Sequence, residues 1–129
     1  MANFQNIVPK RLAQASSGAA YANTSYASIY TVPSGTRTFV KDMDICNTTG
    51  SSVNVIVCFV PAASTTVLGT PGVANAIYYN VAIAANTTLQ WKGTQILNGP
   101  ADNTQAGDTI QFKASAAGVT ITISGGEAT

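Results

Sequence analysis

The chain has 129 residues, a length that suits one domain, and six Lys and Arg against five Asp and Glu give it a net charge of +1. This balance excludes a basic field for nucleic acid and a polyacidic tail. The absence of His excludes His-based triads and His-ligated zinc, and two Cys cannot build a four-thiolate zinc site. We therefore expect no catalytic metal and no cofactor, although loop Asp and Asn could still supply oxygen ligands for calcium.

Residues 1–24 show no sustained hydrophobic period, hold Lys10 and Arg11, and end in a run of small polar residues. We interpret them as an N-terminal arm that precedes a single domain over residues 25–129. The opening stretch MANFQNIVPK lacks the apolar core of a secretory signal, and no apolar run is long enough to span a bilayer. The expectation is a soluble chain that is made in a cytosol and has no membrane partner.

From residue 25 onward the sequence changes to short β-rich runs separated by turn residues, a pattern typical of a sandwich or small barrel. Alternation in the second run places Phe39, Lys41, Met43 and Ile45 on one face. The run 53–60 is apolar on both faces, which indicates an interior strand or one covered by a neighbouring subunit. The expected strands are 25–32, 36–46, 53–60, 76–83, 87–91, 95–97, 109–114 and 119–124.

The long connection of the domain is the segment 61–76, which is rich in Pro, Gly and small polar residues and is therefore either functional or mobile. The runs 76–83 and 87–91 form a hairpin candidate, in which Tyr79 faces the core and Tyr78 faces the other way. Seven or eight short strands with one long connection predict an all-β fold. We expect a single antiparallel β-sandwich of jelly-roll-like type.

Several turn and strand motifs resemble a family of small virion proteins encoded by tailed bacteriophages and prophages. They are YTVPxGT before the second long run, CNTTG, AANTTLQW and AGDTIxxxAS, and the similarity spans about residues 8–126. These motifs support a shared fold better than a shared task. The resemblance implies a structural component of the particle, on the head or on the tail, without catalytic residues.

Acidic residues offer two candidate sites. Asp42 and Asp44 lie two apart in a strand, so their carboxylates share a face and can chelate Ca²⁺ or act as an acid/base pair. The alternative, which we favour, is that both are solvated at the rim of a sheet. Asp102, Asn103 and Asp108 cluster in a turn-rich segment, where such side chains commonly bond their own backbone.

The two cysteines, Cys46 and Cys58, invite a disulfide. If the runs 36–46 and 53–60 pair as a hairpin around the turn, Cys58 lies opposite Lys41 rather than Cys46. The two sulfurs are then several residues apart, beyond the reach of a bridge. We therefore expect free thiols, in agreement with synthesis in a cytosol.

Four residues are candidates for partner binding: Lys10, Arg11, Tyr78 and Trp91. The two basic residues can grip an acidic neighbour or can simply be solvated. The two aromatic residues can form a platform for sugar stacking or a protein hot spot, whereas core packing is the default for Trp91.

The leading hypothesis is a non-enzymatic structural protein of a tailed-phage virion, a capsid decoration or cement protein that binds the particle surface. It would be made in the cytoplasm of the bacterial host. A second hypothesis places the same module on the tail or baseplate as an adaptor. A third, of another class, is a carbohydrate-binding module that recognises the host envelope through Tyr78, Trp91 and the 61–76 loop.

The expected partners are other virion proteins, either the major capsid protein or tail components, and not nucleic acid. The low charge and the two-sided apolar run 53–60 favour a homo-oligomer, and the resemblance favours a trimer. In this hypothesis the arm, with Lys10 and Arg11, extends over an adjacent subunit.

Overall fold

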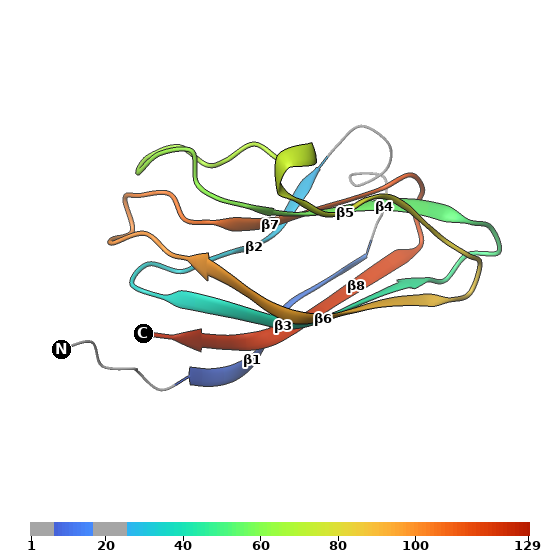
Figure 1. Cartoon of the computed structure of the whole chain (residues 1–129), viewed down its shortest axis with the longest axis horizontal. Coiled ribbons are helices and arrows are strands. Elements are labelled where there is room, and N and C mark those ends of the chain that lie inside the picture. Colours follow the sequence, from blue (N-terminus) through green and yellow to red (C-terminus); the bar gives the residue numbers. More distant parts are fainter. Residues whose placement is uncertain (1–6, 17–25) are drawn as a thin grey trace.

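Two four-stranded antiparallel sheets pack face to face in the computed structural model of the chain (Figure 1). The structure describes residues 7–16 and 26–129. Sheet A has the strand order β1-β8-β3-β6 and sheet B the order β2-β7-β4-β5, so the expected antiparallel β-sandwich is confirmed. The elements are β1 Ile7–Ser16, β2 Ala27–Thr31, β3 Arg37–Asn47, β4 Val53–Val60, the 3-10 turn η2 Val73–Asn75, β5 Ala76–Ile83, β6 Thr88–Asn98, β7 Thr109–Ala114 and β8 Val119–Ala128.

The core lies between the sheets and is formed by the inward side chains of each strand. Burial of one such apolar side chain contributes about 1.5–3 kcal/mol to stability. The largest fully buried side chains include Met43, Ile45, Val55, Val57, Ile110, Phe112, Ile121 and Ile123. Their alternation along β3, β4, β7 and β8 is the pattern from which these strands were expected. Within the described residues, no helix is long and apolar enough to cross a membrane.

A β-bulge shifts the alternation in β3 and corrects one expectation. The register of β3 against β8 changes between Val40 and Asp42, so Lys41 is an extra residue on β3. Val40 and Met43 are both buried, while Lys41 is exposed. Phe39 and Lys41 therefore lie on the outer face, opposite the face of Met43 on which the uninterrupted alternation placed them.

A second bulge, in β5, reverses the expected roles of two tyrosines. Asn80 has a left-handed φ of 52°, and the pairing with β4 shifts around it. Asn tolerates this conformation better than most residues because its short polar side chain can bond locally. Tyr78 consequently packs against the core, whereas Tyr79 is 48% exposed.

Most connections cross from one sheet to the other, which overturns the expected hairpins. The runs 76–83 and 87–91 are present as β5 and the first part of β6, but they belong to opposite sheets. The segment 95–97 is the end of β6 and not a separate edge strand. Among the described strands, only β4 and β5 are consecutive partners in one sheet, and they are joined by the long connection 61–75.

That long connection packs on the outer face of sheet B. Ile56, Cys58 and Val60 form a second buried cluster on this side of β4. The Cys58 thiol donates to the Gly72 carbonyl at 3.7 Å, and a Cβ on Gly69 would lie 2.6 Å from Val60 Cγ1. The two-sided apolar strand is thus an interior strand, and its outer side is covered by the chain itself.

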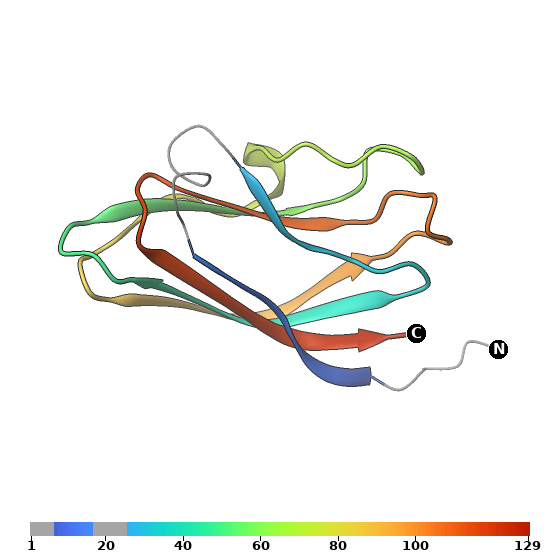
Figure 2. The same cartoon turned by 180° about the vertical axis from the view of Figure 1, so that it is seen from behind.

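Part of the expected arm is a strand. Residues 7–16 form β1, an edge strand of sheet A that pairs with β8 (Figure 2). Leu12 is the extra residue of a bulge, so both it and Ala13 are buried. The bulge interrupts the alternation of apolar and polar residues, and Pro9, Lys10 and Arg11 make this segment look unlike a strand. Pro9 is tolerated here because β1 is an edge strand. The rest of the expected arm, residues 1–6 and 17–24, lies outside the described residues.

The CNTTG motif forms the turn between β3 and β4. Asn47 is fully buried and its side-chain amide donates to the carbonyls of Ser51 at 2.7 Å and Ile83 at 2.9 Å. Its side-chain oxygen accepts from the backbone N–H and the hydroxyl of Thr49. One buried amide therefore holds the β3–β4 turn against the end of β5.

Candidate functional site

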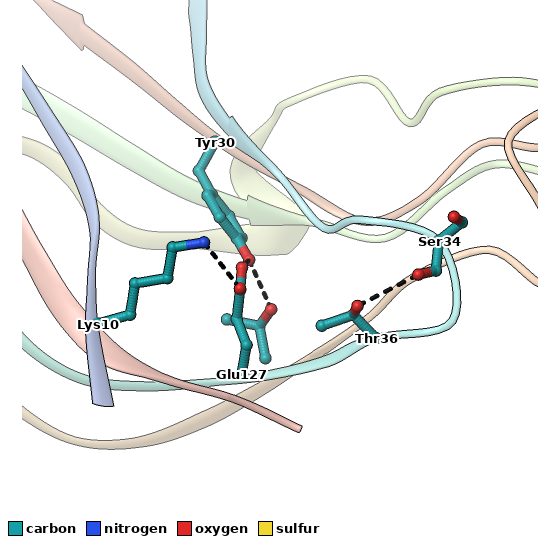
Figure 3. A network of polar contacts seen from close by, with 6 residues as sticks. Lys10, Tyr30, Ser34, Thr36 and Glu127 are labelled. Carbon is teal, nitrogen blue, oxygen red and sulfur yellow. Dashed lines mark hydrogen bonds and ion pairs between the residues drawn. The ribbon is translucent and has the colours of Figure 1, made fainter. Parts of the chain in front are cut away.

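Lys10 lies at one end of the sandwich, in a polar cluster that links the two sheets. Its Nζ forms an ion pair with Glu127 Oε1 at 2.9 Å. The Tyr30 hydroxyl, from sheet B, donates to Glu127 Oε2 at 2.6 Å and lies 2.7 Å from Thr38 Oγ1. Figure 3 shows Lys10 and Tyr30 converging on Glu127. We call Lys10, Tyr30, Thr38 and Glu127 the end cluster.

The end cluster shifts the proton affinities of two of its members. Burial alone would raise the pKa of the Glu127 carboxyl, but the hydrogen bonds from Tyr30 and Lys10 and the charge of Lys10 outweigh it and lower the pKa below its ordinary value. Burial, together with the hydrogen bond to Glu127, raises the pKa of the Tyr30 hydroxyl well above its ordinary value. The cluster therefore holds an ionised carboxylate and a neutral phenol.

Sequence reasoning missed the end cluster as a whole. The expected last strand stopped at residue 124, because the glycine pair Gly125 and Gly126 resembles a strand end. In the structure β8 continues through both glycines to Ala128, and Glu127 faces the other sheet. A Cβ on Gly125 would lie 1.9 Å from the Phe39 carbonyl oxygen, so glycine is required there for the strands to approach closely.

The structure does not bring the four partner-binding candidates together. Lys10 and Arg11 lie on β1 and Trp91 lies on β6, at opposite edges of sheet A, and Tyr78 lies on β5, an edge of sheet B. The Arg11 side chain is exposed and donates to Gln14 Oε1 at 2.8 Å. Lys10, by contrast, is already paired within the chain.

Tyr78 and Trp91 are half-buried and pack against the core. The Tyr78 hydroxyl donates to the Gln90 carbonyl of the other sheet at 3.4 Å, and burial raises its pKa. The Trp91 ring packs edge-on against Phe59, with centroids 5.9 Å apart and an interplanar angle of 83°. These two aromatic residues help to close the side of the sandwich and do not form an exposed platform.

The acidic candidates lie among polar neighbours, but the expectation that Asp42 and Asp44 are both solvated is wrong for Asp42, one oxygen of which is buried. Asp44 accepts from Gln90 Nε2 at 3.0 Å, and Asp42 has Lys92 as its cross-strand neighbour, although its Oδ1 is buried without a hydrogen-bond partner. Asp102 accepts from the backbone and the hydroxyl of Thr104, as expected for a turn residue. In the described part of the chain, no three His, Cys, Asp or Glu side chains are grouped so that they could hold a metal ion.

Asp108 ties three segments together at the same end of the molecule. Its two carboxylate oxygens accept from the backbone N–H of Ala62 at 3.0 Å and of Asn98 at 2.9 Å. Its backbone accepts from Val32 N at 3.0 Å. The loops at this end are therefore braced against one another, and the 98–108 segment has a structural task.

The two cysteines are free thiols in the structure, but the reason given by the sequence was wrong. β3 and β4 belong to opposite sheets and do not pair. Cys46 lies between the buried Ile45 and Asn47, on the outer side of sheet A, whereas Cys58 belongs to the buried cluster outside sheet B. The whole sandwich separates the two sulfurs.

Comparison with known proteins adds information about the fold. No protein-family model and no curated protein matches the sequence. The chain is similar to a protein chain in the structure of the infectious bursal disease virus Gx strain, with a TM-score of 0.50 and 10% identity, over 95% of this chain and 33% of the viral chain. A chain in the Gt strain structure matches with a TM-score of 0.43 and 8% identity, over 98% and 33%. The chain thus spans about a third of these viral chains, and the likeness concerns the fold alone.

Proposed function

We propose that the chain is a non-enzymatic structural protein of a tailed-phage virion, which binds the capsid surface as a decoration or cement protein. The observation that carries the proposal is the strand order. Sheet A, ordered β1-β8-β3-β6, faces sheet B, ordered β2-β7-β4-β5. This order fits a double-sheet jelly roll of eight strands, an architecture that viral capsid proteins use.

Two further observations support a role in a virus particle. The fold is similar to a chain of a virus structure over 95% of its own length. The turn motifs that resemble tailed-phage virion proteins, such as CNTTG, have structural tasks here, as the buried Asn47 illustrates. Fold does not imply function by itself, and the proposal rests on the strand order together with these two observations.

The tail or baseplate position is the alternative within the same class, and the particle experiment below separates it from decoration. The carbohydrate-binding alternative required an exposed pair formed by Tyr78 and Trp91. Both rings pack against the core, so no observation favours that function.

A homo-oligomer remains part of the proposal on the ground of the low charge, and a trimer is its favoured form on the ground of the resemblance. The apolar outer side of β4 no longer supports it, because residues of the same chain cover Ile56, Cys58 and Val60. Sedimentation of the purified chain measures its oligomeric state directly.

The experiment that tests the function compares particles of the phage or prophage that encodes the chain with particles from which its gene has been deleted. Both are purified on density gradients and imaged. We expect the chain in wild-type particles at a fixed ratio to the capsid protein, with difference density on the capsid lattice. Density confined to the tail would favour the adaptor, and a chain abundant in the lysate but absent from purified particles would contradict both positions.

A further inference from the structure

A row of uncharged residues crosses the outer face of sheet A from one edge to the other. Pro9 of β1 pairs with Gly126 of β8, Gly126 pairs with Phe39 of β3, and Phe39 pairs with Ile96 of β6. Phe39 lies between the buried Thr38 and Val40, so its side chain is on the solvent side of the sheet. The four positions therefore form one straight line across all four strands.

The row is apolar and accessible. Ile96 is 49% exposed and Ile7 is 57% exposed, while Phe39 is half-buried. A Cβ on Gly126 would lie 2.6 Å from Ile7 Cγ2, which shows that the Ile7 side chain covers this glycine. We call Ile7, Pro9, Phe39 and Ile96 the apolar row. Contiguous exposed apolar side chains of this kind mark interaction sites on soluble domains.

Cations lie on both sides of the apolar row. Arg37 precedes Phe39 by two residues, and Lys41 follows it by two; Arg11 follows Pro9 by two. Each has a neutral hydrogen-bond partner: Arg37 Nε donates to Asn98 Oδ1 at 3.3 Å, Lys41 Nζ to Thr94 Oγ1 at 2.7 Å, and Arg11 to Gln14. Among residues 7–16 and 26–129, the one ion pair is that of Lys10 with Glu127.

The partners of Arg11, Arg37 and Lys41 are thus neutral. Beside the apolar row, Arg11, Ser124, Asp42 and Lys92 are in register across the sheet, and Asp44 lies two residues farther along β3. The four cations Arg11, Arg37, Lys41 and Lys92 therefore outnumber the two carboxylates on this face. A surface that covers the row must offer apolar contact at its centre and an excess of negative charge around it, because buried cations without a partner are costly.

A second copy of the chain does not meet this requirement. It carries the same excess of cations on this face, four against two carboxylates. A twofold axis along the row can set Arg37 against Asp42, but any pairing of two copies still leaves half of the cations without a carboxylate, and like charges at an interface cost several kcal/mol.

We infer that the outer face of sheet A docks onto a protein surface of the particle that carries an apolar ridge flanked by carboxylates. This inference rests on the proposed function for the identity of the partner. It deepens that function by placing the contact on strands β1, β3 and β6 and by defining the partner's chemistry. Apolar burial supplies the affinity, and Arg11, Arg37 and Lys41 set the orientation.

The test uses gene-deleted particles and purified chain added back in a sedimentation assay. One variant carries Phe39→Ser with Ile96→Ser, and a second carries Arg37→Glu with Lys41→Glu, two residues whose side chains are exposed. The matched control is Val67→Ser with Leu68→Ser, two apolar residues 54% and 53% exposed in the 61–75 connection. Circular dichroism and thermal unfolding verify the fold of every variant.

We expect both sheet A variants to bind at least about tenfold more weakly than wild type, and the control to bind equally. Wild-type binding should also weaken as ionic strength rises from about 0.1 M to about 1 M, because the Debye length falls from about 10 Å to about 3 Å.

Four other results would overturn the inference. Equal binding of the charge-reversal variant and wild type would leave the proposed function intact and remove this face from the contact. Absence of wild-type binding to the deleted particles would defeat the proposed function and the inference together. Self-association that the Phe39 and Ile96 changes abolish, or binding to anionic lipid vesicles instead of particles, would assign the face to a second copy or to a membrane.

Discussion

Removal of the Tyr30 hydroxyl measures how strongly the end cluster joins the two sheets. In the Tyr30→Phe variant the ring stays, but Glu127 loses a donor at 2.6 Å and Thr38 loses a partner at 2.7 Å. The Glu127 side chain is 13% exposed and therefore cannot replace the bond fully with water. A hydrogen bond to a charged group contributes about 1.5–3 kcal/mol, and we expect the free energy of unfolding to fall by about 2 kcal/mol.

Urea unfolding, followed by the fluorescence of the single Trp91, measures this loss. In thermal unfolding the same loss corresponds to a decrease in Tm of about 8 °C. Tyr79→Phe is the matched control, because that tyrosine is 48% exposed, and its free energy of unfolding should change by less than about 0.5 kcal/mol. Equal stability of the two variants would refute a stabilising role for the end cluster.

The pH dependence gives a second check. Because the folded-state pKa of Glu127 is below its unfolded value, its contribution to stability is present above the unfolded pKa and is lost as the pH falls through the folded pKa. The difference between wild type and Tyr30→Phe should therefore be largest near neutral pH and shrink in acid. A difference that stays constant into strong acid would show that the Tyr30 hydroxyl does not act through the ionised Glu127.

Three further changes test other parts of the fold. Leu12→Ala should lower the free energy of unfolding by about 2–4 kcal/mol, because Leu12 is buried in β1, and an unchanged urea midpoint would show that β1 is not part of the folded unit. Asp108→Ala leaves the N–H groups of Ala62 and Asn98 without their acceptor. We expect faster hydrogen exchange at both amides and faster proteolysis of the 61–75 connection, whereas exchange in β8, the control, should not change. Alkylation of the native protein should modify Cys46 before Cys58, because the Cys58 thiol is buried and this burial raises its pKa. In denatured, non-reduced protein both cysteines should be labelled, and a disulfide found by mass spectrometry would contradict this.

The existence of most strands could be predicted from the sequence, because alternation marks the inward side chains wherever the register is regular. Met43 and Ile45, or Ile121 and Ile123, show the period of two that a half-buried strand requires. The faces were predicted wrongly where a bulge adds a residue, as at Lys41 and Asn80, since an extra residue shifts every later side chain to the other face.

The pairing of strands could not be predicted in the same way. Local turn chemistry marks where a strand ends, but it does not say whether the next strand returns beside it or crosses to the other sheet. For the candidate site the difficulty is larger still, because Lys10 and its partner Glu127 are 117 positions apart. Of the four candidates named from the sequence, Lys10 belongs to the end cluster and Arg11 lies beside the apolar row. Tyr78 and Trp91 pack against the core.

The central position of β8 in sheet A also constrains when the domain can form. β8 spans Val119–Ala128 and pairs with β1 on one side and β3 on the other. Until residues 119–128 have been synthesised, β1 and β3 have no strand between them, and sheet A is limited to the β3–β6 pair. Sheet B, in contrast, has all four of its strands once residue 114 has emerged. A nascent chain should therefore hold a half-built sandwich with one apolar face open until the last strand inserts, and such non-local closure is intrinsically slow and exposed to aggregation.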